Sequence, residues 1–187
     1  TRVGRFVLDG VVDPTNWRYK ANLQQEVGFD RNINVFFKWV AKHPRAYHLG
    51  RDWRTIRRGY NALLRKLDRH PAYHRRLGPD ELTDAMINAG YYVYNWNYIA
   101  SAYSKLVRHN RGGQMFGIYA ALNMGDDNGY AVYLGVQCSD ALRPPWRKQV
   151  HDAWRIHRKR PFLAWDNTWF NAPCRTWPAT SQARIAV

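Results

Sequence analysis

The hydrophobic pattern near the start of the chain predicts a short buried strand. The run from Phe6 to Val12 is almost entirely apolar and is interrupted only by Asp9 and Gly10. A short apolar run without alternation is typical of a strand that is covered on both faces, as in a parallel sheet. Such a strand needs neighbours on both sides, but no second strong run of this kind and no alternation of strands with helices follows it.

After a turn at residues 13–16, apolar side chains recur with the period of an amphipathic helix. Five helices are expected, from about Trp17 to His43, from Trp53 to Leu67, from Gly78 onward, from Trp96 to Leu106, and from about Pro145 with Trp146, Val150 and Trp154 inward. Residues 130–138 are compatible with an extended segment, and the Trp- and Pro-rich tail from Pro161 has no clear period. The pattern therefore predicts one strand followed mostly by helices.

The charge adds a second hypothesis to this picture. The 187 residues include 29 Lys and Arg against 14 Asp and Glu, so the net charge is +15. Nucleic acid or another polyanion is therefore the first partner to consider, and a basic binding module remains the alternative to an enzyme. The basic residues fall mostly opposite the apolar stripes, as on a solvated face, and no nucleic-acid-binding motif is present. No apolar run approaches the roughly 20 residues of a membrane span, so we expect no membrane partner.

The sequence contains no convincing catalytic or metal motif of its own. The G-x-S-x-G motif is absent, and Ser139 has no base nearby in the sequence, so a loop serine that caps a helix is expected. His70 and His74 have the spacing of helical metal ligands, but Pro71 breaks the helix that would align them. We expect neither a metal nor another cofactor.

Several segments resemble actinobacterial secreted α/β-hydrolases of the tripeptidyl aminopeptidase family, in the clan of proline iminopeptidase-like serine peptidases. Residues 2–14 (RVGRFVLDGVVDP) resemble the core strand that follows the nucleophile helix in that family. Residues 36–40 (FFKWV), 78–81 (GPDE) and 89–92 (AGYY) resemble its lid, and residues 136–141 (VQCSDA) and 169–178 (WFNAPCRTWP) its two cysteine-bearing signatures.

The resemblance implies an α/β-hydrolase fragment. Residues 1–14 would form one core strand of the sheet, and residues 15–187 a mainly α-helical lid of about five helices with a Trp- and Pro-rich return segment. In the family the nucleophilic serine lies before such a segment, and the catalytic acid and histidine lie after it. We therefore expect no catalytic residue in this chain. The resemblance also implies that Cys138 and Cys174 are joined, because disulfides persist in secreted proteins.

The expected function is that of the lid and substrate pocket of a secreted serine exopeptidase, which hydrolyses short peptides from free N-termini through an acyl-enzyme. Its partners would be the peptide substrate and the remaining portions of the hydrolase core, with no specific nucleic acid. A buried carboxylate is well suited to bind a terminal ammonium. The candidates are Asp9, Asp13 and Glu26, with Asp9 preferred. In one alternative, Asp9 and Asp13 merely fix the turn before Thr15 and Glu26 is solvated. In another, Asp9 orients the catalytic histidine.

Overall fold

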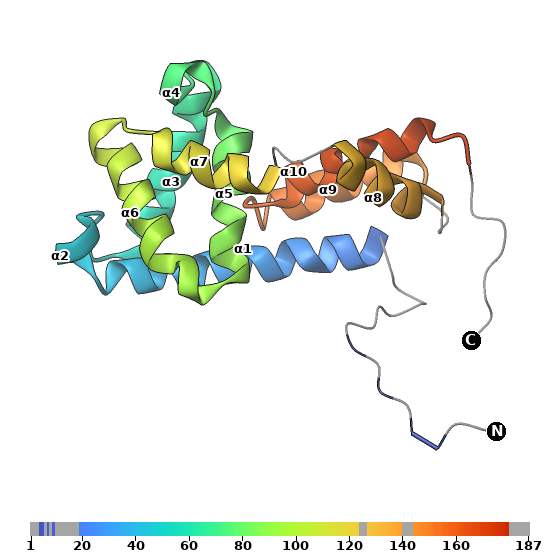
Figure 1. The fold of residues 1–187 in the computed structure, drawn as a ribbon, viewed down its shortest axis with the longest axis horizontal. Coiled ribbons are helices and arrows are strands. Elements are labelled where there is room, and N and C mark those ends of the chain that lie inside the picture. Colours follow the sequence, from blue (N-terminus) through green and yellow to red (C-terminus); the bar gives the residue numbers. More distant parts are fainter. Residues whose placement is uncertain are drawn as a thin grey trace.

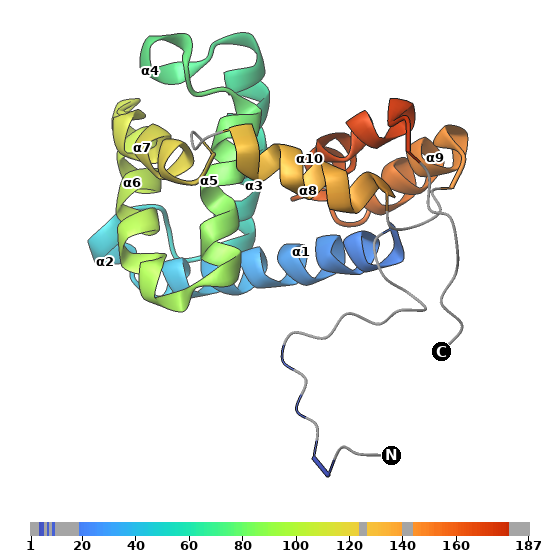
Figure 2. The same cartoon turned by 45° about the vertical axis from the view of Figure 1, so that its right-hand side comes forward.

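The computed structural model describes residues 4, 5, 7, 9, 19–123, 127–139 and 144–179, and these residues contain helices but no strand. The helices are α1 (Tyr19–Ala41), α2 (Pro44–Tyr47), α3 (Trp53–Arg69), α4 (Ala72–Arg75), α5 (Pro79–Tyr91), η1 (Val93–Asn95), α6 (Trp96–His109), α7 (Gly113–Asn123), α8 (Asp127–Ser139), α9 (Trp146–His157), α10 (Ala164–Phe170) and η2 (Ala172–Thr176). The long helix α1 joins two groups of helices: α2 to α7 gather around one end, and α8 to α10 lie beside the other (Figures 1 and 2).

The sequence sets several of these helix ends locally. The carboxylate of Asp52 accepts hydrogen bonds from the backbone N–H groups of Arg54 and Thr55, so it caps the start of α3. Helix α5 starts with Pro79, and the Glu81 carboxylate reaches back to accept the Gly78 N–H at 2.7 Å. These bonds satisfy backbone donors that the first turn of a helix leaves unpaired.

The main core lies where α1 crosses α3, α5 and α6. Ile33, Phe36, Phe37 and Val40 are fully buried, which confirms the predicted inner face of α1. The ring of Phe37 lies 5.7 Å from that of Tyr60 on α3, which is also fully buried. Burial of such large side chains contributes about 1.5–3 kcal/mol each and fixes the angles between the helices.

All five predicted helices are present, but two local expectations were wrong and one helix was not predicted. Residues 130–138, expected to be extended, belong to α8. Leu134 and Cys138 are buried one helical turn apart on that helix, beside Cys174. Trp154 was expected to point inward but is 46% exposed. Helix α10 lies in the tail for which no period was recognised, because seven residues span only two turns.

The predicted core strand falls largely outside the described residues. Val7, one of the few described positions in that run, is 91% exposed. The strand and the boundary between residues 1–14 and 15–187 therefore stay predictions. Among the described residues, no helix is both long and apolar enough to cross a membrane.

Candidate functional site

A cavity of about 260 Å³ lies between α1, α5 and α10. The last residue of α7 and one residue from the middle of α8 complete its lining. Its lining residues are Gln25, Phe29, Asp84, Ile87, Tyr91, Asn123, Tyr133, Leu163, Asp166, Asn167 and Phe170. Four of them are aromatic and two are acidic. The cavity thus brings together segments more than 140 positions apart, which the contacts of α1 with α5 and α10 hold in place.

Two carboxyl groups face each other in this cavity. Asp84 on α5 and Asp166 on α10 lie within hydrogen-bond reach of each other. Burial, and then the charges of neighbouring acids, raise the pKa of both groups, that of Asp166 to about 8. Two carboxylates at such a separation share a proton, because a like charge next to a buried group disfavours its ionised form. The pair therefore holds a proton to higher pH than isolated carboxyl groups do.

Glu26 on α1 is a third acid next to the cavity. Its side chain lies beside Asn167, a lining residue, and Glu26 is only 1% exposed. Burial raises the pKa of Glu26 to about 7, although the Asn167 amide opposes this shift. Glu26 Oε2, Asp166 Oδ2 and Asn167 Nδ2 are all buried, and none of these three atoms makes a hydrogen bond of good geometry among the described residues. Buried polar atoms without a well-formed hydrogen bond are rare in folded proteins, and they leave acceptor and donor capacity for a further group.

The basic residues of the chain do not fill that place. In the described part of the chain, the ion pairs of buried acids involve Asp30 and Asp152, and none involves Glu26, Asp84 or Asp166. A cavity with aromatic walls and acids that lack a basic partner suits an organic cation, because carboxylates and ring faces both attract positive charge. Among the described residues, no group of three or more acidic, His or Cys side chains could hold a metal ion.

The predicted ammonium-binding acids are placed differently from one another. Glu26 lies beside the cavity, Asp9 is exposed and does not line it, and Asp13 is outside the described residues. The role predicted for them stays a prediction. The sequence analysis did not identify Asp84 and Asp166 as candidate site residues. Asp166 lies in the apolar segment 162–170 (FLAWDNTWF), where a lone acidic residue indicates a candidate site.

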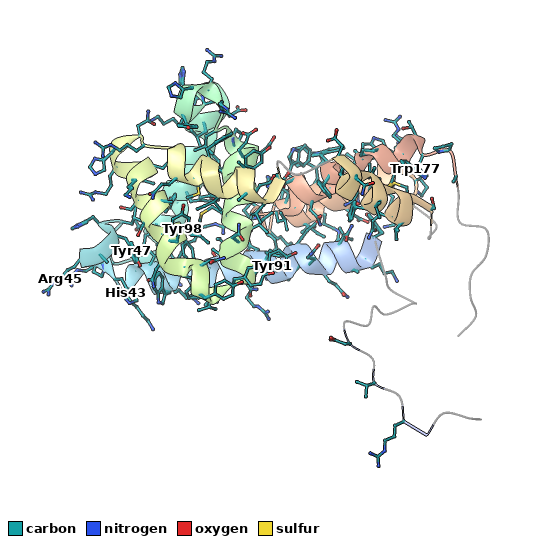
Figure 3. The ribbon with its side chains drawn as sticks, viewed as in Figure 1. His43, Arg45, Tyr47, Tyr91, Tyr98 and Trp177 are labelled. Atoms are coloured by element: carbon teal, nitrogen blue, oxygen red, sulfur yellow. A yellow bond between two sulfur atoms is a disulfide. The ribbon has the colours of Figure 1, made fainter. Side chains whose placement is uncertain are left out.

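The predicted bond between Cys138 and Cys174 is confirmed. The structure contains this disulfide, with the two Cα atoms 4.9 Å apart. It joins the end of α8 to η2. Beside it, Trp177 Nε1 donates a hydrogen bond to Ser139 Oγ at 3.1 Å; Figure 3 labels Trp177. The disulfide therefore anchors the helix that carries Tyr133 into the cavity wall.

A second hollow lies at the corner between α1 and α2. It has a volume of about 410 Å³ and includes the basic residues Lys42, His43, Arg45 and Arg51. Figure 3 shows His43 and Arg45 at this outer end of the molecule. All four side chains are exposed, so this hollow is an open basic surface and lacks buried polar groups like those of the acidic cavity.

Comparison with characterised proteins places the chain among hydrolase-like sequences. It is 37% identical over 196 residues to tripeptidyl aminopeptidases of Streptomyces lividans and Streptomyces coelicolor, and the match covers 99% of this chain. This chain is a sequence relative of the actinobacterial tripeptidyl aminopeptidases. It spans only 36% of the length of those two relatives. A carboxylesterase B of Mycobacterium tuberculosis is 29% identical over 191 residues, and no family model matches the chain.

Proposed function

We propose that this chain is the lid and substrate-pocket portion of a secreted serine exopeptidase of the α/β-hydrolase class. The complete enzyme hydrolyses short peptides from free N-termini through an acyl-enzyme, and the remaining portions of its hydrolase core supply the catalytic triad. The relatives that support this proposal are named as an aminopeptidase and an esterase, and the chain aligns over nearly its whole length with about a third of them. The disulfide fits an oxidising compartment.

The unpaired acids of the cavity carry the proposal. An exopeptidase must distinguish a terminal ammonium from an internal amide, which has no charge. The Asp84–Asp166 pair and Glu26 lack a basic partner among the described residues, so an incoming ammonium completes the site. A charged hydrogen bond to a buried carboxylate contributes about 1.5–3 kcal/mol. An N-acetylated substrate cannot make this bond and leaves the acids unpaired.

The helices above such a pocket act as a roof. Aromatic side chains from α1, α5, α8 and α10 line the cavity and exclude water around a bound peptide end. Exclusion of water strengthens the attraction between carboxylate and ammonium, because the effective dielectric constant falls. A closed roof also limits how much peptide fits between the ammonium site and the nucleophile, which favours short products.

The test compares two substrates in the complete enzyme: a short peptide p-nitroanilide with a free amino end and its N-acetylated form. We expect Asp166→Asn and Asp84→Asn to lower kcat/KM for the free peptide by about 10- to 100-fold, the loss of a charged hydrogen bond. Activity on the N-acetylated substrate is expected to stay within about twofold, since that substrate makes no such bond. Asp127→Asn, which changes an exposed acid outside the cavity, is the matched control.

Equal losses on both substrates would contradict an ammonium site and indicate a structural role for the two acids. The absence of any peptide hydrolysis, with no labelling by a fluorophosphonate, would contradict the exopeptidase proposal itself. Retention on DNA that persists at about 200 mM salt would then favour the alternative of a basic polyanion-binding module, because nonspecific contacts fade at that salt concentration.

A further inference from the structure

A row of exposed tyrosines lies next to the acidic cavity. Tyr91, Tyr92 and Tyr94, where α5 ends and η1 begins, are 56%, 45% and 76% exposed, and we call them the tyrosine ladder. Val93 between them is 68% exposed. Four consecutive large side chains with such exposure form a contiguous apolar patch, and such patches mark surfaces that bind a partner or a ligand.

The tyrosine ladder is continuous with the cavity. Tyr91 lines the cavity, and its ring meets that of Phe29, another lining residue, edge to face at 4.6 Å. The ring centroids then follow one another at 5.7 Å from Tyr91 to Tyr92 and at 5.1 Å from Tyr92 to Tyr94. Figure 3 shows Tyr91 where α5 meets α1. A ligand whose charged end lies in the cavity would therefore leave it across this row of rings.

The backbone beneath the tyrosine ladder is held in place. Asn32 Nδ2 donates to the carbonyl of Gly90 at 3.0 Å, and Trp96 Nε1 donates to the carbonyl of Ala89 at 2.8 Å. Gly90 itself packs so closely on Phe29 that a Cβ atom would lie 2.5 Å from the ring. These contacts hold the backbone that carries the rings in place, so that ligand binding costs little conformational entropy in the protein.

We propose that the tyrosine ladder binds the first side chains of the peptide substrate and gives the enzyme a preference for aromatic and large aliphatic residues near the free N-terminus. This inference rests on the proposed function, because the ammonium in the acidic cavity fixes where the peptide begins. Flat tyrosine faces gain dispersion and aromatic contacts from such side chains, whereas Gly or Ser gives them little area to cover. The tyrosine ladder thus determines specificity, while the acids recognise the charge.

The test is a kinetic comparison in the complete enzyme with chromogenic tripeptides that differ only at the first two residues, with Phe or Leu set against Gly or Ser. We expect the double variant Tyr92→Ala and Tyr94→Ala to lower kcat/KM about five- to tenfold for the apolar series, mostly through KM, as for the loss of one or two aromatic contacts. Activity on the Gly and Ser series should change by less than about twofold, because those peptides make few of these contacts.

Two further variants separate stacking from other roles. The double variant Tyr92→Phe and Tyr94→Phe keeps the rings and should keep the preference, since the proposed contacts involve the ring faces and not the hydroxyl groups. Tyr98→Ala is the matched control, because Tyr98 is 53% exposed on α6 but has no ring contact with the tyrosine ladder.

The outcomes also distinguish this inference from the proposed function. A uniform fall in kcat/KM across all tripeptides, together with a lower Tm, would show that the tyrosine ladder packs against the hydrolase core, and would overturn the inference. Unchanged preferences in an enzyme that still requires a free amino end would overturn it as well, while leaving the ammonium site intact. Loss of the requirement for a free amino end would instead count against the proposed function.

Discussion

The buried and half-buried acids of the protein fall into two groups with opposite surroundings. Asp30 is bound by Arg57 at 2.9 Å and approached by Arg160 at 3.7 Å, and Asp152 is bound by Lys148 at 2.7 Å. Glu26, Asp84 and Asp166 have no such partner in the described part of the chain. These acids belong to one protein with a charge of +15. An excess of bases therefore does not pair every buried acid, because pairing depends on which side chain reaches which carboxylate.

The pKa values follow the same division. Asp152 is 5% exposed and burial opposes its ionisation, but hydrogen bonds from Lys148 and Tyr19 hold the pKa of Asp152 well below its usual range. Glu26 is 1% exposed and has only the neutral Asn167 amide beside it, so burial raises its pKa to about 7. Similar burial thus produces opposite shifts according to the partners, which identifies the paired acids as structural and the unpaired acids as candidates for a ligand site.

The largest expected effect is the loss of stability when an acid that has a basic partner is removed. Asp30→Ala leaves the Arg57 guanidinium, 11% exposed, without its main carboxylate. Removal of one partner of a buried ion pair costs about 3–5 kcal/mol, so the free energy of unfolding in urea should fall by that amount. Asp52→Ala is the control, since it removes an exposed helix cap worth about 1 kcal/mol. Equal costs for the two variants would remove the distinction between a buried and an exposed partner.

A smaller effect of opposite sign, a gain in stability, is expected when an acid without a basic partner is neutralised. The pKa of Glu26 is raised from 4.5 to about 7 by burial, so the folded state holds a proton that the unfolded chain has released. Stability from this group is present below about pH 4.5 and is lost as the pH rises to about 7. Glu26→Gln removes the ionised form and should stabilise the protein by about 2–3 kcal/mol at about pH 8, with little change at about pH 4.

The measurement is the difference in unfolding free energy between wild type and Glu26→Gln across this pH range. Taking the difference removes the contributions of other groups, including His157, whose pKa is lowered by burial and whose pH dependence has the opposite sign. A difference that stays constant from about pH 4 to about pH 8 would mean that Glu26 does not titrate in this range, and would contradict the unpaired environment.

The smallest effect is expected when a basic partner is supplied to the Asp84–Asp166 pair. Asn123 lies on the rim of the cavity at the end of α7 and is exposed, so a lysine there can reach toward the Asp84–Asp166 pair. Asn123→Lys should raise the unfolding free energy at about pH 8 by about 1 kcal/mol, because it supplies the missing charge partner. It should also lower kcat/KM for free peptides by occupying the ammonium site. Asn123→Gln, which adds length without charge, should do neither.

The sequence was informative wherever structure is decided within one helix. The spacing of Ile33, Phe36, Phe37 and Val40 predicted the buried face of α1, and Pro79 with Glu81 predicted the start of α5. Such signals depend on residues within about one turn of each other, so the sequence displays them directly. The disulfide was predicted only because its two segments resemble those of a known family. The extended segment expected at 130–138 was wrong because a single helical turn of buried residues leaves too short a periodic signal.

The acidic cavity itself was decided by tertiary structure. Asp84 and Asp166 are 82 positions apart, and nothing local in either segment indicates that α5 and α10 bring them together. The sequence determined that acids are few, that they stand among apolar residues and that bases are in excess. Which acids would find a base depended on how the helices cross along α1, because charge pairing acts over a few ångströms and chain distance does not measure it. In the described part of the chain, the packing of the helices leaves Glu26, Asp84 and Asp166 without a basic partner.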